Sequence, residues 1–361
     1  MKYSFFLGAN SPNGFFSYYD YLIDPETAND VFIIKASPGG GKSSFMRKAS
    51  EPLTGTGART EYILCSSDPD SLDGVIFPDE GIAFVDGTTP HAVEPTYPYV
   101  VDKYLHLGRF ADENLLKENR VEILAAFKSY RECYSAVYRC LRAAKLVGDE
   151  LSTMVYSKEI EKKILKRARG IISREIVGRG AGAIEKRRFL SGISPDGIVF
   201  LCETVNALCS RVYEINDTYG LAHTMLSNIR DAALKSDFEV YCCYCPMSPD
   251  TMLEHVIIPE LSLGFISKPY GRDSIMLAPY RRVNLDGYLD HTHMAKSKQR
   301  RSFMRKARAA LIDEAVATLS EAKQQHDAIE KLYNSAIDFD GLYELAEKIG
   351  KILLAKYKKK S

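Results

Sequence analysis

The sequence predicts an α/β protein made of two tandem domains, each a parallel sheet followed by a helical-hairpin arm. Two observations support this prediction. An apolar strand at 31–34 runs into a glycine-rich turn and then a helical pattern, and much of this stretch recurs in the second half of the chain. Strands that alternate with helices specify parallel strands joined by crossover helices. At 361 residues the chain is long enough for two such domains.

The glycine-rich turn has the spacing of a phosphate-binding loop (P-loop), [AG]xxxxGK[ST], in the segment ASPGGGKSS at 36–44. Its glycines lack a β-carbon, so consecutive backbone N–H groups can approach phosphate oxygens. The N-terminus of the following helix adds about half a positive charge, and Lys42 adds a full one for the β- and γ-phosphates. Ser43 is placed to bind Mg²⁺. The residues expected to bind ATP are Ser37, Pro38, Gly39, Gly40, Gly41, Lys42, Ser43 and Ser44.

An internal repeat extends well beyond this loop. The segment FLGANSPNG at 6–14 returns as FLSGISPDG at 189–197, and 32–46 aligns without a gap with 212–226. Further matches follow in the same order, 61–70 with 241–250, 75–79 with 256–260 and 81–85 with 262–266. The chain is therefore expected to be a duplicated P-loop unit. The expected parts are a P-loop domain at 1–110, a helical arm and linker at 111–186, a degenerate P-loop-like domain at 187–290 and a C-terminal helical arm at 291–361.

The second copy of the loop has lost the residues that would bind phosphate and magnesium. The residues Gly41, Lys42 and Ser43 are replaced by LAH at 221–223. A leucine side chain would fill the phosphate space, and no ammonium group replaces the lysine. His223 is a poor ligand for Mg²⁺, which prefers oxygen. We therefore expect one active nucleotide site and one degenerate site.

Asp86 ends the apolar strand at 81–85, where an acid that holds Mg²⁺ beside a phosphate loop would stand. The second copy has Ser267 at this position, so the loop lysine and the acid are lost together. With Ser43, Asp86 is expected to hold Mg²⁺; the alternative is that it only caps the strand or forms a turn. No glutamate follows Asp86, which favours kinase-like and GTPase-like proteins over ATPases that place a catalytic glutamate there.

Two further residues near the same sheet edge are candidate catalytic groups. Asp68 follows the second strand, and the second copy has Ser248 in its place, whereas the neighbouring Asp70 is retained. Asp68 could activate water or an acceptor hydroxyl. His91 could orient a nucleophile or contact phosphate, although a lone loop histidine is more often structural. The residues expected in catalysis are Lys42, Asp86, Asp68 and His91.

The two helical arms are expected at about 113–176, with a break near Gly148, and at about 298–357, with a break near 338–341. Long helices with charged faces usually form antiparallel hairpins that pack on a domain; docking of a protein partner is the alternative. Basic residues at 174–188 could bring an arginine to the γ-phosphate. Those at 296–308 could meet nucleic acid or an acidic partner. Solvated charge is the simpler explanation of both runs.

Composition narrows the class of protein. The chain has 48 basic and 47 acidic residues and a formal net charge of +1, which excludes a globally basic nucleic-acid-binding protein. No apolar run reaches the roughly 18 residues that span a bilayer, and the start MKYSFF does not read as a signal peptide. We expect a cytoplasmic protein without membrane contact. Its eight cysteines form no CxxC pair and are expected to be reduced.

The chain resembles a family of bacterial ATPase-like proteins, within the P-loop NTPases, built from two tandem P-loop domains. The resemblance rests on FLGANSPNG and its echo, on ASPGGGKSS, on CSSDPDSLDGVIFPD at 65–79 and on VDGTTPH at 85–91. It implies ATP binding and names no substrate. In that family the second loop can also carry a glycine-lysine-serine/threonine signature, which this chain lacks.

These observations predict an Mg-ATP-binding protein with slow or partner-stimulated hydrolysis of nucleoside triphosphate. One alternative is an ATP-dependent kinase of a small metabolite or nucleoside, with Asp68 as the base for the acceptor. Another is a non-enzymatic adaptor whose ATP site sets the angle between its halves. The chain has no NKxD motif, which favours ATP over GTP.

Overall fold

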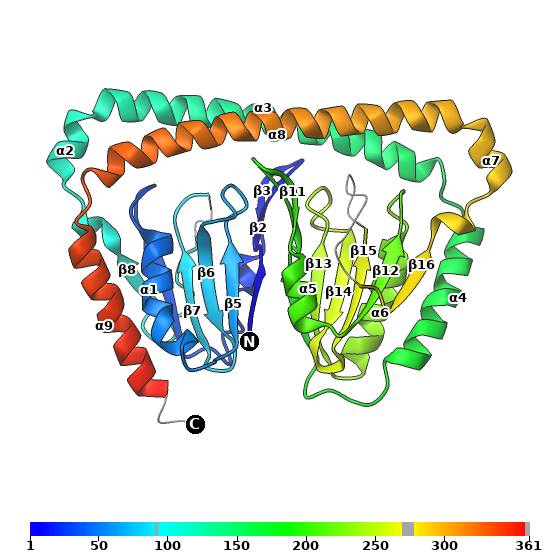
Figure 1. The fold of residues 1–361 in the computed structure, drawn as a ribbon, viewed down its shortest axis with the longest axis horizontal. Coiled ribbons are helices and arrows are strands. Elements are labelled where there is room, and N and C mark those ends of the chain that lie inside the picture. The colour runs from blue at the N-terminus through cyan, green and yellow to red at the C-terminus, as the bar shows by residue number, and fades with distance from the viewer. Residues whose placement is uncertain (91–92, 269–277, 358–361) are drawn as a thin grey trace. The chain divides into compact units, whose positions relative to one another are not determined.

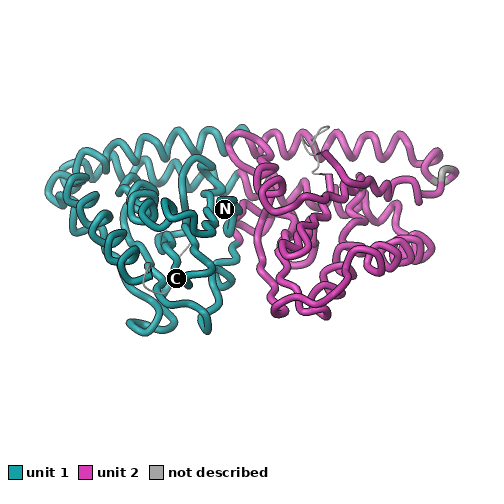
Figure 2. Tube along the Cα trace, turned by 60° about the horizontal axis from the view of Figure 1, so that its bottom comes forward, with its two compact units in different colours: residues 1–8, 17–136, 317–361 teal, residues 9–16, 137–316 magenta. Residues whose placement is uncertain are grey.

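The computed structural model describes residues 1–90, 93–268 and 278–357. It confirms the α/β class, with two six-stranded mixed sheets and their flanking helices (Figure 1). The chain forms two compact units, coloured separately in Figure 2. Unit 1 comprises Met1–Gly8, Ser17–Ala136 and Ala317–Ser361, and unit 2 comprises Ala9–Phe16 and Val137–Val316. Each unit therefore combines segments that are far apart in the sequence.

The sheet of unit 1 places β4 (Asp30–Lys35), the strand before the glycine-rich loop, between two parallel neighbours. These neighbours are β7 (Ile82–Asp86) and β8 (Asp102–His106). The strand order is β1 (Lys2–Phe5), β5 (Thr60–Leu64), β6 (Leu72–Phe77), β7, β4 and β8. The apolar residues of β4 and β7 are buried along both faces, as a central strand requires.

The sheet is mixed, so the prediction of a parallel sheet is wrong at one strand. β6 runs antiparallel to both β5 and β7. The connections on either side of it, at 65–71 and 78–81, contain no helix. A parallel crossover needs roughly a dozen residues or more, so connections this short can only reverse the chain.

The sheet of unit 2 repeats this topology strand for strand. Its order is β9 (Ile184–Arg188), β13 (Glu239–Tyr244), β14 (Leu253–Ile258), β15 (Leu263–Ser267), β12 (Arg211–Asn216) and β16 (Arg281–Asn284). β12 pairs in parallel with β15 and β16, and β14 runs antiparallel to both of its neighbours. The repeat in the sequence therefore corresponds to a repeated sheet.

Two hairpins carry the repeated segments FLGANSPNG and FLSGISPDG. They consist of β2 (Gly8–Ser11) with β3 (Gly14–Ser17), and of β10 (Ser191–Ser194) with β11 (Gly197–Phe200). In each turn a serine hydroxyl accepts a hydrogen bond from the N–H two residues later and donates to the carbonyl three residues later. The glycine that ends each turn has φ near 100°, so this repeat is explained by turn geometry.

Helices α1 and α6 follow the two loops, and α3 and α8 are the longest helices of the described residues (Figure 1). The helices are α1 (Lys42–Thr54), α2 (Glu113–Glu118), α3 (Arg120–Thr153), α4 (Lys158–Glu175), α5 (Cys202–Leu208), α6 (Ala222–Lys235), α7 (His291–Lys296), α8 (Lys298–Asn334) and α9 (Phe339–Tyr357). Short 3₁₀ turns lie at η1 (Tyr19–Tyr21), η2 (Leu107–Phe110), η3 (Pro259–Leu261) and η4 (Asp286–Tyr288).

The breaks in the two arms differ in how well the sequence predicted them. The first arm breaks at 154–157, and the prediction of a break near Gly148 is wrong because α3 continues through it. A glycine inside a helix costs only about 1 kcal/mol, and here it gives room to the guanidinium of Arg308, whose Cζ would lie 3.1 Å from a β-carbon at Gly148. The second arm breaks at 335–338, next to the predicted position.

Each arm ends in a helix that packs on the helix following one of the two loops, instead of folding back as the predicted hairpin (Figure 1). α9 packs along α1 and buries Leu342, Ala346 and Leu353 in the core of unit 1. A β-carbon at Gly350 would lie 2.8 Å from the carbonyl oxygen of Ala49, so the glycine permits this close approach. α4 packs along α6 in unit 2. The apolar stripe of each short helix finds a buried partner on a sheet-covering helix.

The end of α9 is anchored by a buried carboxylate at the start of β4. Asp30 accepts hydrogen bonds from Lys356 Nζ at 2.6 Å and from the Tyr357 hydroxyl at 2.7 Å, and it pairs with Lys103. Burial alone would raise the pKa of Asp30. The hydrogen bonds outweigh burial and hold the pKa below its ordinary value.

The end of α4 is anchored in the same way, with the charges reversed. Glu175 accepts a hydrogen bond from the Tyr213 hydroxyl at 2.6 Å and pairs with Arg211 at 2.6 Å. These contacts outweigh burial and hold the pKa of Glu175 below its ordinary value. Arg211 stands at the start of β12 as Asp30 stands at the start of β4. The strand therefore supplies the anion in unit 1 and the cation in unit 2.

All eight cysteines are free thiols, as expected. Among the helices of the described residues, none is both long and apolar enough to cross a membrane.

Candidate functional site

The first loop has a backbone suited to an anion site. It joins β4 to α1, and its residues Gly39 and Gly41 have φ angles of 63° and 73°, which side chains with a β-carbon rarely adopt. The N–H of Gly40 donates to the carbonyl of Ser37 at 3.1 Å and closes the turn. The first N–H groups of α1, from Lys42 onward, have no partner within the helix and are available to an anion at its N-terminus.

Lys42, the first residue of α1, and Asp86, the last residue of β7, lie together beside this loop. The Lys42 ammonium donates to the carbonyl of Ser37 at 2.9 Å and lies 3.6 Å from Asp86 Oδ2. The two side chains are 14% and 8% exposed, so the pair is largely shielded from water. Asp86 Oδ1 accepts from the N–H and hydroxyl of Thr88 at 2.8 and 2.5 Å. One carboxylate oxygen of Asp86 is thus held by its own turn, and the other faces Lys42.

The remaining loop residues occupy different positions around the site. Ser43 Oγ accepts a hydrogen bond from the N–H of Leu72 at 3.0 Å, which joins the first turn of α1 to the start of β6. Ser44 is exposed on the same turn, and Pro38 is half-buried in the loop. The serine oxygen that is expected to bind Mg²⁺ therefore also makes a structural hydrogen bond.

The last turns of α8 contact the first loop, a feature that the sequence did not reveal. Glu330 Oε1 accepts a hydrogen bond from the N–H of Gly39 at 3.2 Å. A β-carbon at Gly39 would lie 2.6 Å from Asn334 Oδ1 and 2.9 Å from the carbonyl oxygen of Glu330. The glycine is required here for two reasons, the positive φ and the close approach of α8.

Asp68 lies beside the same turns of α8. Its carboxylate pairs with Lys323 at 3.3 Å and accepts from the Ser71 hydroxyl at 2.7 Å. Lys323 also pairs with Asp327 at 3.3 Å. Burial opposes the charge of Lys323, but the two carboxylates outweigh it and raise the pKa of the lysine. His91 lies outside the described residues.

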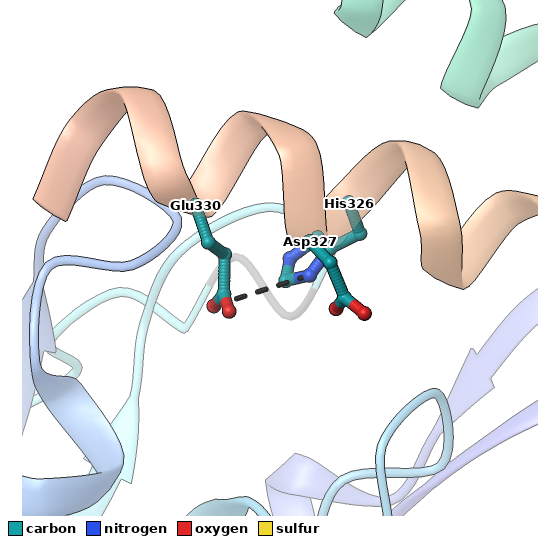
Figure 3. A group of neighbouring side chains, drawn as sticks. All are labelled: His326, Asp327 and Glu330. Carbon is teal, nitrogen blue, oxygen red and sulfur yellow. Dashed lines mark ion pairs between the residues drawn. The ribbon is translucent and has the colours of Figure 1, made fainter.

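Three side chains of α8 form a cluster of the kind that can hold a metal ion. Figure 3 shows His326, Asp327 and Glu330 on the face of α8, with the imidazole directed toward Glu330. The His326 Nδ1 atom lies 3.9 Å from Glu330 Oε1. Asp327 is already paired with Lys323, whose positive charge opposes a second cation, and Glu330 is bound by the loop. Ion pairs and hydrogen bonds account for the cluster without a metal.

Strand pairing corrects the alignment of the two loops by one residue. Ile34 lies opposite Asp86 in unit 1, and Ile215 lies opposite Ser267 in unit 2, so Ile34 matches Ile215 and not residue 214. Both registers put apolar residues in the strand, which is why the sequence did not locate the shift. The loop spans residues 36–41 in unit 1 and only 217–221 in unit 2.

The shorter second loop contains its own anion. Asp217 accepts hydrogen bonds from the N–H groups of Ala222 at 2.6 Å and Tyr219 at 3.2 Å, and from that of Leu221. Burial raises the pKa of Asp217, and these N–H groups offset part of the rise. The backbone donors that would surround a phosphate are therefore occupied by a carboxylate of the same loop.

The end of α3 contacts the second loop much as α8 contacts the first. Ser152 Oγ donates to the carbonyl of Tyr219 at 2.6 Å, and a β-carbon at Gly220 would lie 3.5 Å from Ser152 Oγ. Arg301 donates to the Tyr219 hydroxyl at 2.6 Å. A long helix contacts each loop, and the contact of α8 with the first loop is made through the carboxylate of Glu330.

Comparison of the chain with protein-family models, with curated proteins and with solved structures found no match.

Proposed function

We propose that the protein binds Mg-ATP at the loop of residues 36–44 and hydrolyses it slowly or when stimulated by a partner. The observation that supports this most is the pair of Lys42 and Asp86, 3.6 Å apart beside a loop with two positive-φ glycines. The second copy of the sheet has neither residue and fills its loop with Asp217. One site of the two has kept the groups that a nucleotide needs.

Each residue of the first site has a role that follows from its position. The N–H groups of the loop and of the first turn of α1 would hold phosphate oxygens, and the Lys42 ammonium would neutralise them. The hydroxyl of Ser43 and the carboxylate of Asp86 are the oxygen ligands that Mg²⁺ prefers, and the ion would supply charge neutralisation at the phosphates. The donor set fits a magnesium nucleotide.

The contacts of Asp68 favour slow hydrolysis over phosphate transfer to an acceptor. Its carboxylate pairs with Lys323 and accepts from Ser71, so it is engaged within the protein. A general base must be free to take the proton of its acceptor. The kinase alternative would require Lys323 to release this carboxylate first.

The test is an equilibrium titration of labelled ATP with Mg²⁺ against the unaltered chain, Lys42→Ala and Lys48→Ala. Lys48 is a matched control, because it lies on α1 and pairs with Glu347 at its surface. We expect Lys42→Ala to weaken binding about tenfold or more and Lys48→Ala to leave it unchanged. Equal affinities for the unaltered chain and Lys42→Ala would overturn the proposal. If Lys42→Ala weakens binding as expected, single-turnover assays separate a slow hydrolase from an adaptor that binds ATP without turnover.

A further inference from the structure

Glu330 places an anionic oxygen where the first loop would bind phosphate. Its carboxylate accepts the hydrogen bond of the Gly39 N–H at 3.2 Å. Carboxylate and phosphate oxygens are the same kind of acceptor for a backbone N–H at a helix N-terminus. One N–H group cannot fully serve both acceptors, and two negative groups at one site repel each other.

The hydrogen bond between Glu330 and the first loop can break more easily than the hydrogen bonds of Asp217 within the second loop. Asp217 is part of the second loop and accepts hydrogen bonds from three of its N–H groups, so its carboxylate cannot leave them without unfolding that loop. Glu330 accepts one loop N–H, and its side chain is 39% exposed. Rotation of this side chain toward water would free the Gly39 N–H.

A second observation ties the same turn of α8 to the loop. Asn334 Oδ1 and the backbone of Glu330 lie so close to Gly39 that no side chain fits between them. About two turns earlier, Lys323 connects α8 to Asp68. A ligand that enters the loop at Gly39 therefore meets α8 directly.

We propose that Glu330 is a binding-site residue of the first loop, where its carboxylate competes with nucleotide phosphate for the N–H of Gly39. ATP must displace this carboxylate, and α8 is held less firmly once it has done so. The inference rests on the proposed function and adds a residue, distant in sequence, that lowers the affinity of the site.

The first experiment measures ATP affinity with Mg²⁺ for the unaltered chain, Glu330→Gln and Glu321→Gln. Glu321 is a matched control, because it is an exposed glutamate on the same helix. Glu330→Gln removes the charge and keeps the shape, so we expect ATP to bind about tenfold more tightly. Glu321→Gln should leave the affinity unchanged. An affinity of Glu330→Gln equal to or weaker than that of the unaltered chain overturns the inference.

The second experiment follows amide hydrogen exchange of residues 323–334 in the unaltered chain, with Lys42→Ala as the control that does not bind ATP. We expect faster exchange at these amides when Mg-ATP is added, and unchanged exchange when Lys42→Ala is treated in the same way. Slower or equal exchange on ATP addition contradicts displacement of Glu330. ATP binding that requires Lys42 but is insensitive to Glu330→Gln would leave the proposed function standing and this inference overturned. A chain that binds no ATP with either residue at 330 would overturn both.

Discussion

Ser43 and His223 occupy matching positions and make the same hydrogen bond with different chemistry. Ser43 Oγ accepts from Leu72 N–H at 3.0 Å, and His223 Nδ1 accepts from Leu253 N–H at 3.0 Å. Burial lowers the pKa of His223, which keeps the ring neutral and Nδ1 able to accept. A ring nitrogen can therefore accept this backbone hydrogen bond as well as a serine oxygen does. An oxygen at residue 43 is needed only if the residue also binds a hard cation.

This difference leads to a prediction for Ser43→Ala. The substitution leaves the N–H of Leu72 without its acceptor, so the free energy of unfolding should fall by about 1–3 kcal/mol. It also removes one of the two expected ligands of Mg²⁺, so ATP binding should depend less on magnesium. Ser43→Thr should keep both properties. Urea unfolding and ATP titrations with magnesium or chelator measure the two effects; a destabilised variant with unchanged magnesium dependence would leave Ser43 a structural role alone.

At the scale of elements, local features were predictable from the sequence and tertiary contacts were not. The strand, loop and first helix of the candidate site are encoded within residues 31–54, and the structure has them there. The direction of β6 depends on the length of two connections, which the alternation of strands and helices does not report. Glu330 lies 291 residues from Gly39 in the chain. Nothing in the pattern of α8 distinguishes this glutamate from the others on the helix.

The anchor of α9 gives a prediction at this scale. Asp30→Asn removes the charge that Lys356, Tyr357 and Lys103 share, and both lysines can turn to water, so unfolding free energy at neutral pH should fall by about 1–3 kcal/mol. Because the pKa of Asp30 is lowered in the folded state, its contribution is present above the ordinary pKa and is lost as pH falls through the folded value.

The unaltered chain and Asp30→Asn should therefore differ in stability at pH 7 and converge in acid, below both pKa values of Asp30. Urea unfolding at several pH values checks this. Asp20→Asn, at an exposed position, is the control. A difference that persists in acid would show that the substitution acts through packing instead of charge.

At the scale of the whole molecule, the charges at the ends of α9 and α4 match each helix to the sheet of its own unit. α9 brings Lys356 to Asp30 in unit 1, and α4 brings Glu175 to Arg211 in unit 2. If the two helices changed places, each would meet a like charge at the start of its strand, an arrangement that disfavours the wrong pairing. The sequence shows two copies of one plan. It does not show that α9, from the second arm, packs in unit 1 and that α4, from the first arm, packs in unit 2, because the two helices carry similar apolar stripes.

Removal of α9 tests this assignment. A chain that ends at residue 338 should lose the packing of Leu342, Ala346 and Leu353 against α1 and expose the core of unit 1, while unit 2 keeps α4. Limited proteolysis with mass spectrometry should then find rapid cleavage within 17–136 and slower cleavage within 137–316. A chain that ends at residue 357 is the control. Equal protection of both segments after removal of α9 would contradict the assignment.

The place of α9 in unit 1 also determines the order in which the protein can mature during translation. Ribosomes add roughly 5–20 residues per second, and domains generally fold as they emerge. Unit 2 has all of its segments once residue 316 has emerged, although unit 1 supplies the first residues of the chain. The surroundings of the first loop are completed last, because the turns of α8 that contact it and helix α9 both lie within 317–357. The nascent chain thus carries the glycine-rich loop while the 291 residues from Gly39 to Glu330 are made, before the two can form their hydrogen bond.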